Sequence, residues 1–115
     1  MSPEARSSAG FKMAILETSV LDLDDAKVLR VRGEVDLASS DVLMSAAEPL
    51  VKADVGTLRL DMTGVTFIDS SGIRSILLLD ERCRETGVSF QIDPSEQVQR
   101  VMTLVGLSFD GNAAA

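Results

Sequence analysis

The sequence predicts one α/β domain, with a mixed, mostly parallel β-sheet of four to five strands and helices packed on it. Its 115 residues are near the commonest domain size, and 45% of them are apolar, enough for one core. Runs with strand-like patterns alternate with runs of helical spacing in the second half of the chain, which implies parallel strand pairs with right-handed crossovers. We expect residues 11–110 to form the domain and residues 1–10 and 111–115 to be flexible ends.

Five runs have the residue pattern of strands. In chain order they are residues 13–20, 28–32, 57–62 with the continuation 65–68, 88–92, and a short edge strand at 107–109. A polar turn at residues 22–25 separates the first two strands, and Gly33 is expected to bound the second. The predicted order is therefore β-β-α-β-α-β-α, with the edge strand last.

The first helix is expected to follow Ser39, which can cap it, and it has Asp41 in its first turn. Pro49 should kink or close the last turn, because proline lacks the backbone N–H of a helix interior. The apolar residues recur at helical spacing and form one stripe: Val42, Leu43, Ala46, Ala47, Leu50 and Val51.

The second helix is expected over residues 73–83. One face is directed at the sheet and consists of Gly72, Ile76, Leu79 and Cys83, with Gly72 permitting a close approach. Three apolar residues lie off that face: Ile73, Leu77 and Leu78. They either pack against a neighbouring helix or form a surface for a partner.

The third helix has a typical opening. Asp93 is expected to be its N-cap, with Pro94 at the first helical position and Glu96 three residues after the cap. Its buried stripe is Val98, Val101, Met102 and Val105. Gly106 is expected to end it.

The composition argues against several classes of function. A formal net charge of −7, with four Phe and no Tyr or Trp, argues against nucleic-acid binding and favours a basic protein partner. The absence of histidine rules out a Ser-His-Asp triad within the chain and leaves few ligands for zinc. Because there is also no glycine-rich phosphate loop, we expect no enzymatic activity, no cofactor and no metal ion.

The single cysteine and the hydropathy pattern bear on the cellular compartment. Cys83 excludes an internal disulfide and, within an apolar helical run, is expected to be a buried, inert thiol rather than a redox sensor. No apolar stretch approaches the length that spans a bilayer, and residues 1–10 have no apolar signal core. We therefore expect a cytoplasmic protein that does not insert into a membrane.

Residues 69–72, with the sequence Asp-Ser-Ser-Gly, are the most informative motif, since they stand where a strand turns into a helix. Backbone N–H groups at a helix start have no partners within the helix, and the helix dipole favours negative charge there. A phosphate on Ser70 or Ser71 would lie in this favourable field, with Asp69 opposing it. The turn is therefore a candidate phosphorylation site with two hydroxyls.

A second acidic turn contains Gly33, Glu34 and Asp36 and follows the second predicted strand. If that strand is parallel to the third, Asp36 and Asp69 come near each other at one edge of the sheet. Asp36 then has three possible roles. It caps a turn, it adds an acidic element for a basic partner, or it binds a metal ion, for which too few carboxylates converge.

These two motifs at this spacing resemble the pattern of STAS-domain anti-sigma factor antagonists, over roughly residues 12–109. The resemblance implies the STAS fold and implies that Ser70, directly after the aspartate, is phosphorylated by a cognate anti-sigma factor with serine kinase activity. The unmodified domain would bind that kinase and release the sigma factor, phosphorylation would switch binding off, and a serine phosphatase would restore it. The alternative is a STAS accessory subunit that docks on a membrane transporter ATPase without phosphorylation.

The residues expected to contact the partner are Gly33, Glu34, Asp36, Asp69, Ser70, Ser71, Gly72, Ile73, Arg74 and Leu77. Arg74 departs from the family pattern, which commonly has a small residue there. It lies four residues after Ser70 on the same helix face, so we hypothesise that it partly pairs with a phosphate on Ser70. The alternative is an arginine that only meets solvent.

Overall fold

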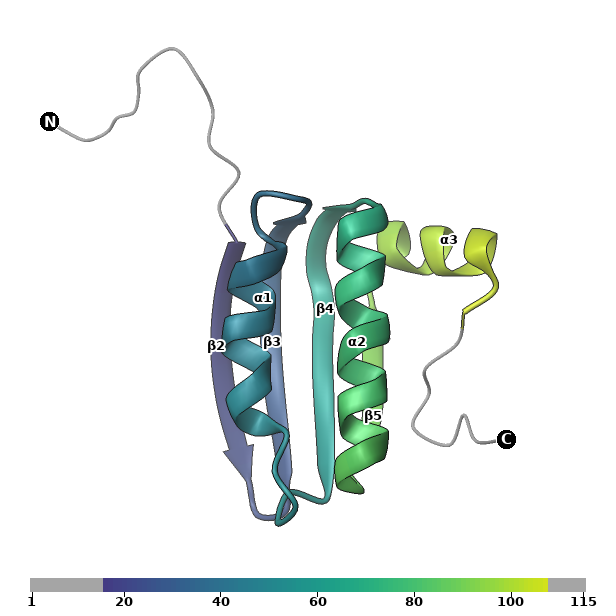
Figure 1. Ribbon diagram of the computed structural model, residues 1–115. Helices are drawn as coiled ribbons and strands as arrows, with labels where there is room; N and C mark the ends of the chain where they lie inside the picture. Colours follow the sequence, from purple (N-terminus) through teal and green to yellow (C-terminus); the bar gives the residue numbers. More distant parts are fainter. Residues whose placement is uncertain (1–15, 108–115) are drawn as a thin grey trace, which may run out of the picture.

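The computed structural model describes residues 16–107, which form a four-stranded sheet with helices on it (Figure 1). The elements in chain order are β2 (Leu16–Leu23), β3 (Ala26–Val35), α1 (Ser40–Ala47), the 3₁₀ helix η1 (Glu48–Leu50), β4 (Thr57–Ile68), α2 (Ser70–Thr86), β5 (Ser89–Pro94) and α3 (Glu96–Val105). The strand order is β2-β3-β4-β5, in which β2 and β3 are antiparallel and the other two pairs are parallel. The predicted mixed, mostly parallel α/β sheet is confirmed.

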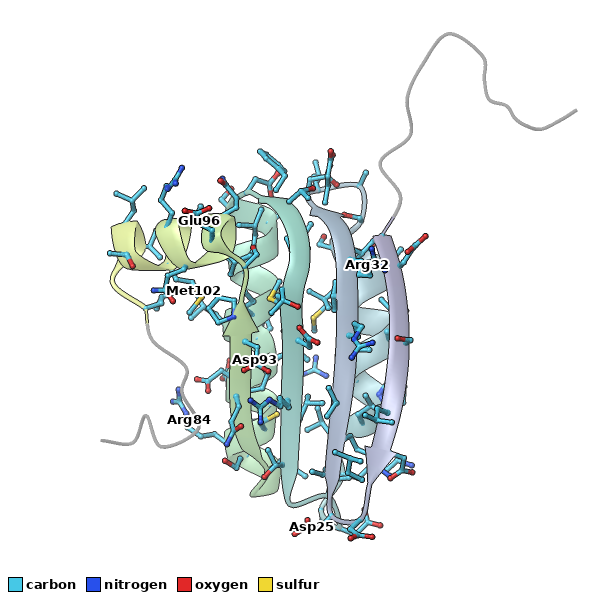
Figure 2. The ribbon with its side chains drawn as sticks, turned by 180° about the vertical axis from the view of Figure 1, so that it is seen from behind. Asp25, Arg32, Arg84, Asp93, Glu96 and Met102 are labelled. Carbon is cyan, nitrogen blue, oxygen red and sulfur yellow. The ribbon has the colours of Figure 1, made fainter. Side chains whose placement is uncertain are left out.

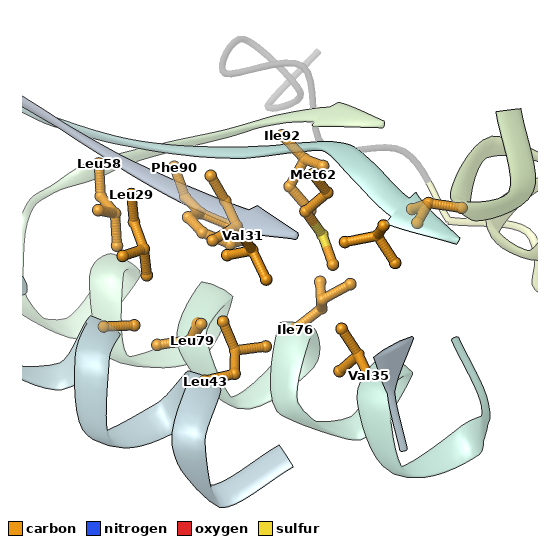
Figure 3. Packing of buried hydrophobic residues seen from close by; sticks show 14 of the residues in the cluster. Leu29, Val31, Val35, Leu43, Leu58, Met62, Ile76, Leu79, Phe90 and Ile92 are labelled. Carbon is orange, nitrogen blue, oxygen red and sulfur yellow. The ribbon is translucent and has the colours of Figure 1, made fainter. Parts of the chain in front are cut away.

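Helices α1 and α2 lie side by side on one face of the sheet, and the hydrophobic core fills the layer between (Figure 1). In that layer Leu29 of β3 faces Leu43 of α1 and Leu79 of α2, and all three are fully buried (Figure 3). Each such side chain contributes about 1.5–3 kcal/mol through burial. Helix α3 packs instead against β4 and β5, where it buries Val98 and Met102.

Strand β4 is continuous through residues 57–62 and 65–68, which were predicted as a strand and its continuation. Two bulges accommodate the two residues by which β4 exceeds the paired part of β3. The buried residues of β4 are Leu58, Leu60, Met62, Val65 and Ile68. Their spacing widens from two to three along the strand, and the register against β3 shifts between Arg30 and Arg32 and between Gly33 and Glu34. Gly33 was predicted to bound this strand, but β3 continues through it to Val35. Gly33 adopts a φ of 116° at one of these shifts, a conformation that favours glycine.

The other face of the sheet carries charged side chains over β3, β4 and β5 (Figure 2). Arg59 donates two hydrogen bonds to Asp93, at 2.5 and 2.9 Å, and Arg30 donates one to Asp61 at 3.3 Å. Beside them is a shallow hollow of about 290 Å³, lined by Arg30, Arg32, Thr63 and Gly64. Exposed ion pairs contribute only about 0–1 kcal/mol each, so their main effect is to keep this face polar.

The end of the first strand and the turn after it differ from the prediction. β2 continues to Leu23, and the turn is confined to Asp24 and Asp25. Asp24 adopts a φ of 31°, which aspartate tolerates better than most residues because its short side chain bonds locally. The predictions for residues 1–15 and 108–115, including both flexible ends and parts of the first and last strands, lie outside the described residues.

Helix α1 begins where it was predicted to, but two details differ. Ser39 occupies the N-cap position, yet its side chain makes no capping hydrogen bond to the helix. Leu43 and Ala47 of the predicted stripe are buried, and Ala46, Leu50 and Val51 are partly buried against the core, whereas Val42 is exposed. Pro49 lies in η1 and closes the helix, as expected.

The predicted cap of the last helix is wrong. Asp93 belongs to β5, where it is paired with Asp61 of β4 in the parallel ladder and its side chain makes an ion pair with Arg59. Ser95 is the N-cap of α3, and its hydroxyl oxygen accepts a hydrogen bond from the backbone N–H of Val98 at 3.1 Å. Gly106 ends α3 with a φ of 76°, as predicted, and Leu107 after it is not in a strand.

Candidate functional site at the start of helix α2

The ends of β3 and β4 bring the two acidic motifs to one edge of the sheet. Val35 and Ile68, the last residues of these parallel strands, are paired in register. The backbone N–H of Asp69 donates to the carbonyl of Val35 at 3.2 Å. Asp36 and Asp69 each follow directly on these strand ends, so the predicted proximity of the two motifs is confirmed.

Asp69 is the N-cap of α2, and this role explains why the helix begins at Ser70 rather than at residue 73. One oxygen, Oδ1, accepts hydrogen bonds from the backbone N–H groups of Ser71, at 2.9 Å, and Gly72, at 3.2 Å. These groups would otherwise lack partners, and a cap of this kind contributes about 1 kcal/mol. The Asp69 carboxylate is therefore held beside the Ser70 hydroxyl.

Ser70 and Ser71 differ in accessibility. Ser70 is the first residue of α2 and is exposed, and its hydroxyl makes no hydrogen bond within residues 16–107. Ser71 is half-buried. Of the two hydroxyls, that of Ser70 is the one that another protein reaches more easily.

The turn between β3 and α1 is held together by Asp36 and Ser39. Asp36 Oδ1 accepts from the backbone N–H of Ser39 at 3.1 Å and lies 3.0 Å from the Ser39 hydroxyl. That hydroxyl also accepts from the N–H of Asp36 and lies 2.6 Å from the carbonyl of Glu34. Asp36 thus caps a turn, which was one of its predicted roles, and its half-buried carboxylate is fixed at the acidic edge.

Two of the predicted contact residues are buried in the domain itself. A Cβ on Gly72 would lie 2.6 Å from Ile68 Cγ1 and 2.9 Å from the Val35 carbonyl oxygen, so Gly72 lets α2 approach the sheet. Ile73 belongs to the core cluster, so of the two roles left open for it, packing inside the domain is the one that the structure shows. Both residues support the site from beneath and are not available to a partner.

The exposed part of the site includes apolar residues that the sequence did not single out. Leu37, in the turn before α1, is 78% exposed, and Phe67, near the end of β4, is 43% exposed. Arg74, Leu77 and Leu78 are also exposed, on α2, as their spacing indicated. Phe67 was read as one of a run of apolar strand residues, and only the bulge in β4 turns it outward.

The described residues were also compared with what metal sites and membrane spans require. Between residues 16 and 107, no three His, Cys, Asp or Glu side chains are grouped closely enough to hold a metal ion. In the same part of the chain, no helix has both the length and the apolar character needed to cross a membrane.

The sequence was compared with known protein families. Residues 19–108 match the family described as "Mlab, STAS domain", which is more than half of the chain. The chain belongs to the STAS domain family. The STAS fold and the family resemblance predicted from the two motifs are therefore confirmed.

Solved structures share the fold of this STAS domain. An anti-sigma factor antagonist from Mycobacterium paratuberculosis is 27% identical with a TM-score of 0.69, over 80% of this chain and 79% of that one. The anti-sigma factor antagonist SpoIIAA in its unphosphorylated form is 20% identical with a TM-score of 0.67, over 79% and 82%. The Bacillus cell fate determinant SpoIIAA in its phosphorylated form is 19% identical with a TM-score of 0.63, over 79% and 85%.

Proposed function

We propose that this STAS domain is a cytoplasmic anti-sigma factor antagonist. It binds an anti-sigma factor that is also a serine kinase, releases the sigma factor, and is switched off when that kinase phosphorylates Ser70. The observation that carries the proposal is the exposed Ser70 hydroxyl at the start of α2, beside the fixed carboxylates of Asp69 and Asp36. Solved proteins of the same fold that are named anti-sigma factor antagonists, and one solved in a phosphorylated form, support it.

The modification is a phosphoryl transfer in which this domain is the substrate. The kinase supplies ATP, the Ser70 oxygen forms a bond to the γ-phosphorus, ADP leaves, and the hydroxyl proton passes to a base of the kinase. A serine phosphatase hydrolyses the ester and restores the free hydroxyl. Each phosphate adds about −1.5 to −2 charges to the edge that already carries Asp69 and Asp36.

The proposed contact surface explains why such a charge would end binding. It consists of Glu34, Asp36, Leu37, Phe67, Asp69, Ser70, Arg74 and Leu77, which surround the start of α2. Leu37, in the turn before α1, and Phe67, three residues before Ser70, are exposed apolar side chains that a partner at this edge would cover. A phosphate would then lose its water beside two carboxylates, at a cost of about 2–5 kcal/mol of binding.

The test is to incubate the purified domain with ATP and candidate anti-sigma kinases from the same genome, and to locate the phosphate by mass spectrometry. We expect modification at Ser70, its loss in Ser70→Ala, and its persistence in the matched control Ser71→Ala. Ser70→Asp should weaken binding to the anti-sigma factor at least tenfold, or about 1.4 kcal/mol, by calorimetry.

Three results would contradict the proposal. The first is phosphate at another residue, and the second is unchanged affinity of Ser70→Asp. The third is co-purification with a transporter ATPase while Ser70 stays unmodified, which would support the accessory-subunit role.

A further inference from the structure

Arg74 is an exposed cation in an otherwise acidic part of the surface. Residues 33–39 and 65–73, which include the ends of β3 and β4, the turn before α1 and the start of α2, contain no Lys or Arg. Most other arginines in the described residues are in ion pairs with carboxylates: Arg30, Arg59, Arg82, Arg84 and Arg100. Arg74 makes no ion pair within residues 16–107, so its guanidinium group is free to bind an anion.

The geometry of α2 places this guanidinium beside Ser70. Residues four apart lie one turn above each other on the same side of a helix, and side chains lean toward the helix N-terminus. The stem of Arg74 therefore leans toward Ser70, which is also exposed. An anionic group that precedes a cation by four residues is the favourable order for such a pair.

The same side of α2 continues into apolar residues. Leu77 and Leu78, three and four residues after Arg74, are 44% and 38% exposed. A partner that covers Ser70 and these leucines must also cover Arg74, which lies between them. Since a buried, unpaired guanidinium is costly, such a partner has to supply an acidic group.

We propose that Arg74 has two alternative anionic partners and thereby determines both partner selection and the strength of the switch. When Ser70 is unmodified, Arg74 pairs with a carboxylate of the anti-sigma factor. When Ser70 is phosphorylated, Arg74 pairs with the phosphate one turn away and is withdrawn from the binding surface. The inference rests on the proposed function for its first partner, but the phosphate pair depends only on this chain.

The phosphate pair is tested without any kinase. Phosphoserine is incorporated at position 70 during synthesis, and the second pKa of the phosphate is followed by ³¹P NMR. A neighbouring guanidinium favours the dianion, so we expect this pKa to be about 0.3–0.5 pH units higher in Arg74→Ala than in the unsubstituted domain, with Arg74→Lys between them.

The matched control is Arg84→Ala, which removes an equal charge from the same helix about 15 Å further along its axis. Arg84 pairs with Asp80 rather than with the site. Equal phosphate pKa values in Arg74→Ala and Arg84→Ala would overturn the phosphate pair, whether or not an anti-sigma factor exists.

The partner role is tested by a four-way comparison of affinity for the anti-sigma factor, with and without Arg74→Ala and with and without the phosphate. We expect Arg74→Ala to weaken the unmodified domain about 5- to 30-fold and the phosphorylated domain less than about twofold. Equal weakening of both forms would overturn the exchange of partners. If no anti-sigma factor binds even the unsubstituted domain, the proposed function fails, while the NMR result is unaffected.

Discussion

At the scale of single residues, the candidate site is one accessible hydroxyl among side chains that the fold has already fixed. Asp69 caps α2 and Asp36 closes the turn before α1. In each residue the Oδ1 atom of the carboxylate accepts the hydrogen bonds from backbone N–H groups. Their carboxylates are thus ordered before any partner arrives, which lowers the entropic cost of binding. Ser70, by contrast, is left exposed.

Cys83, on the buried face of α2, is inaccessible where Ser70 is exposed, and its reactivity can be tested. It is 1% exposed, and burial, with a smaller contribution from the Asp80 charge, raises the pKa of its thiol to about 11. Only about 0.1% is then thiolate at pH 8. We expect the folded domain to react with a thiol reagent at least about 100-fold more slowly than the denatured chain, with Cys83→Ala as the blank.

Comparable rates in the folded and denatured states would show that Cys83 is accessible. That result would contradict the predicted inert thiol and would reopen a redox role.

At the scale of elements, the start of α2 depends on how closely the helix approaches the ends of β3 and β4. Gly72 lies where the helix crosses Val35 and Ile68, and no side chain fits between them. The same contact sets the position of Asp69 and Ser70, which directly precede it in the chain. Packing at Gly72 therefore determines the position of the Ser70 hydroxyl on the surface.

Gly72→Ala should destabilise the domain by about 1–3 kcal/mol through overpacking, although alanine favours a helix more than glycine does. Its Cβ would meet Ile68 and the Val35 backbone at 2.6–2.9 Å. The free energy of unfolding in urea measures the effect.

Glu81→Ala, at an exposed position of the same helix, is the control, because it adds no atom between the helix and the sheet. A loss at position 72 no larger than that at position 81 would mean that α2 shifts easily, contrary to the close approach described.

At the scale of the whole molecule, the sheet has one face beneath α1 and α2 and another that carries charge (Figure 2). Asp61 is the best-connected acid of the second face, with its side chain 17% exposed. Burial alone would raise its pKa. Hydrogen bonds from the hydroxyl and backbone of Thr63 and the ion pair with Arg30 outweigh this, so the pKa lies below its ordinary value of 3.8.

The lowered pKa makes stability depend on pH. Because the folded state favours the carboxylate, Asp61 contributes stability that is fully present above the unfolded pKa of 3.8 and is lost as the pH falls through the lower folded pKa. Urea unfolding between about pH 5 and pH 2 should therefore show a shallower acid loss in Asp61→Asn than in the unsubstituted domain.

An acid loss in Asp61→Asn as steep as in the unsubstituted domain would contradict the assignment of Asp61.

Much of the fold was predictable because its signals are local. Helical spacing located α2 and α3, Gly106 marked the end of α3, and the alternation of strands and helices implied parallel pairing. Parallel pairing in turn placed Asp36 and Asp69 at one edge. These inferences hold because periodicity and glycine conformation act within a few residues.

The errors and the alternatives left open share a different cause, since each depended on a neighbour distant in the sequence. Asp93 looked like a helix cap, but pairing with Asp61 of the adjacent strand makes it part of β5, where its side chain also pairs with Arg59. For Ile73 the sequence left core packing and a partner surface both open, and only the packed fold places it in the core. Phe67 looked like an ordinary strand residue until a bulge turned it to the surface.

The sequence alone determined the α/β order, the acidic turns and the choice of residues 69–72 as the candidate site, because local patterns carry that information. The tertiary structure decided which members of the site are accessible. It buried Gly72 and Ile73, fixed Asp36 and Asp69 by hydrogen bonds, and left Ser70 and Arg74 exposed one turn apart. Accessibility depends on how separate elements pack, and a single element's pattern does not contain it.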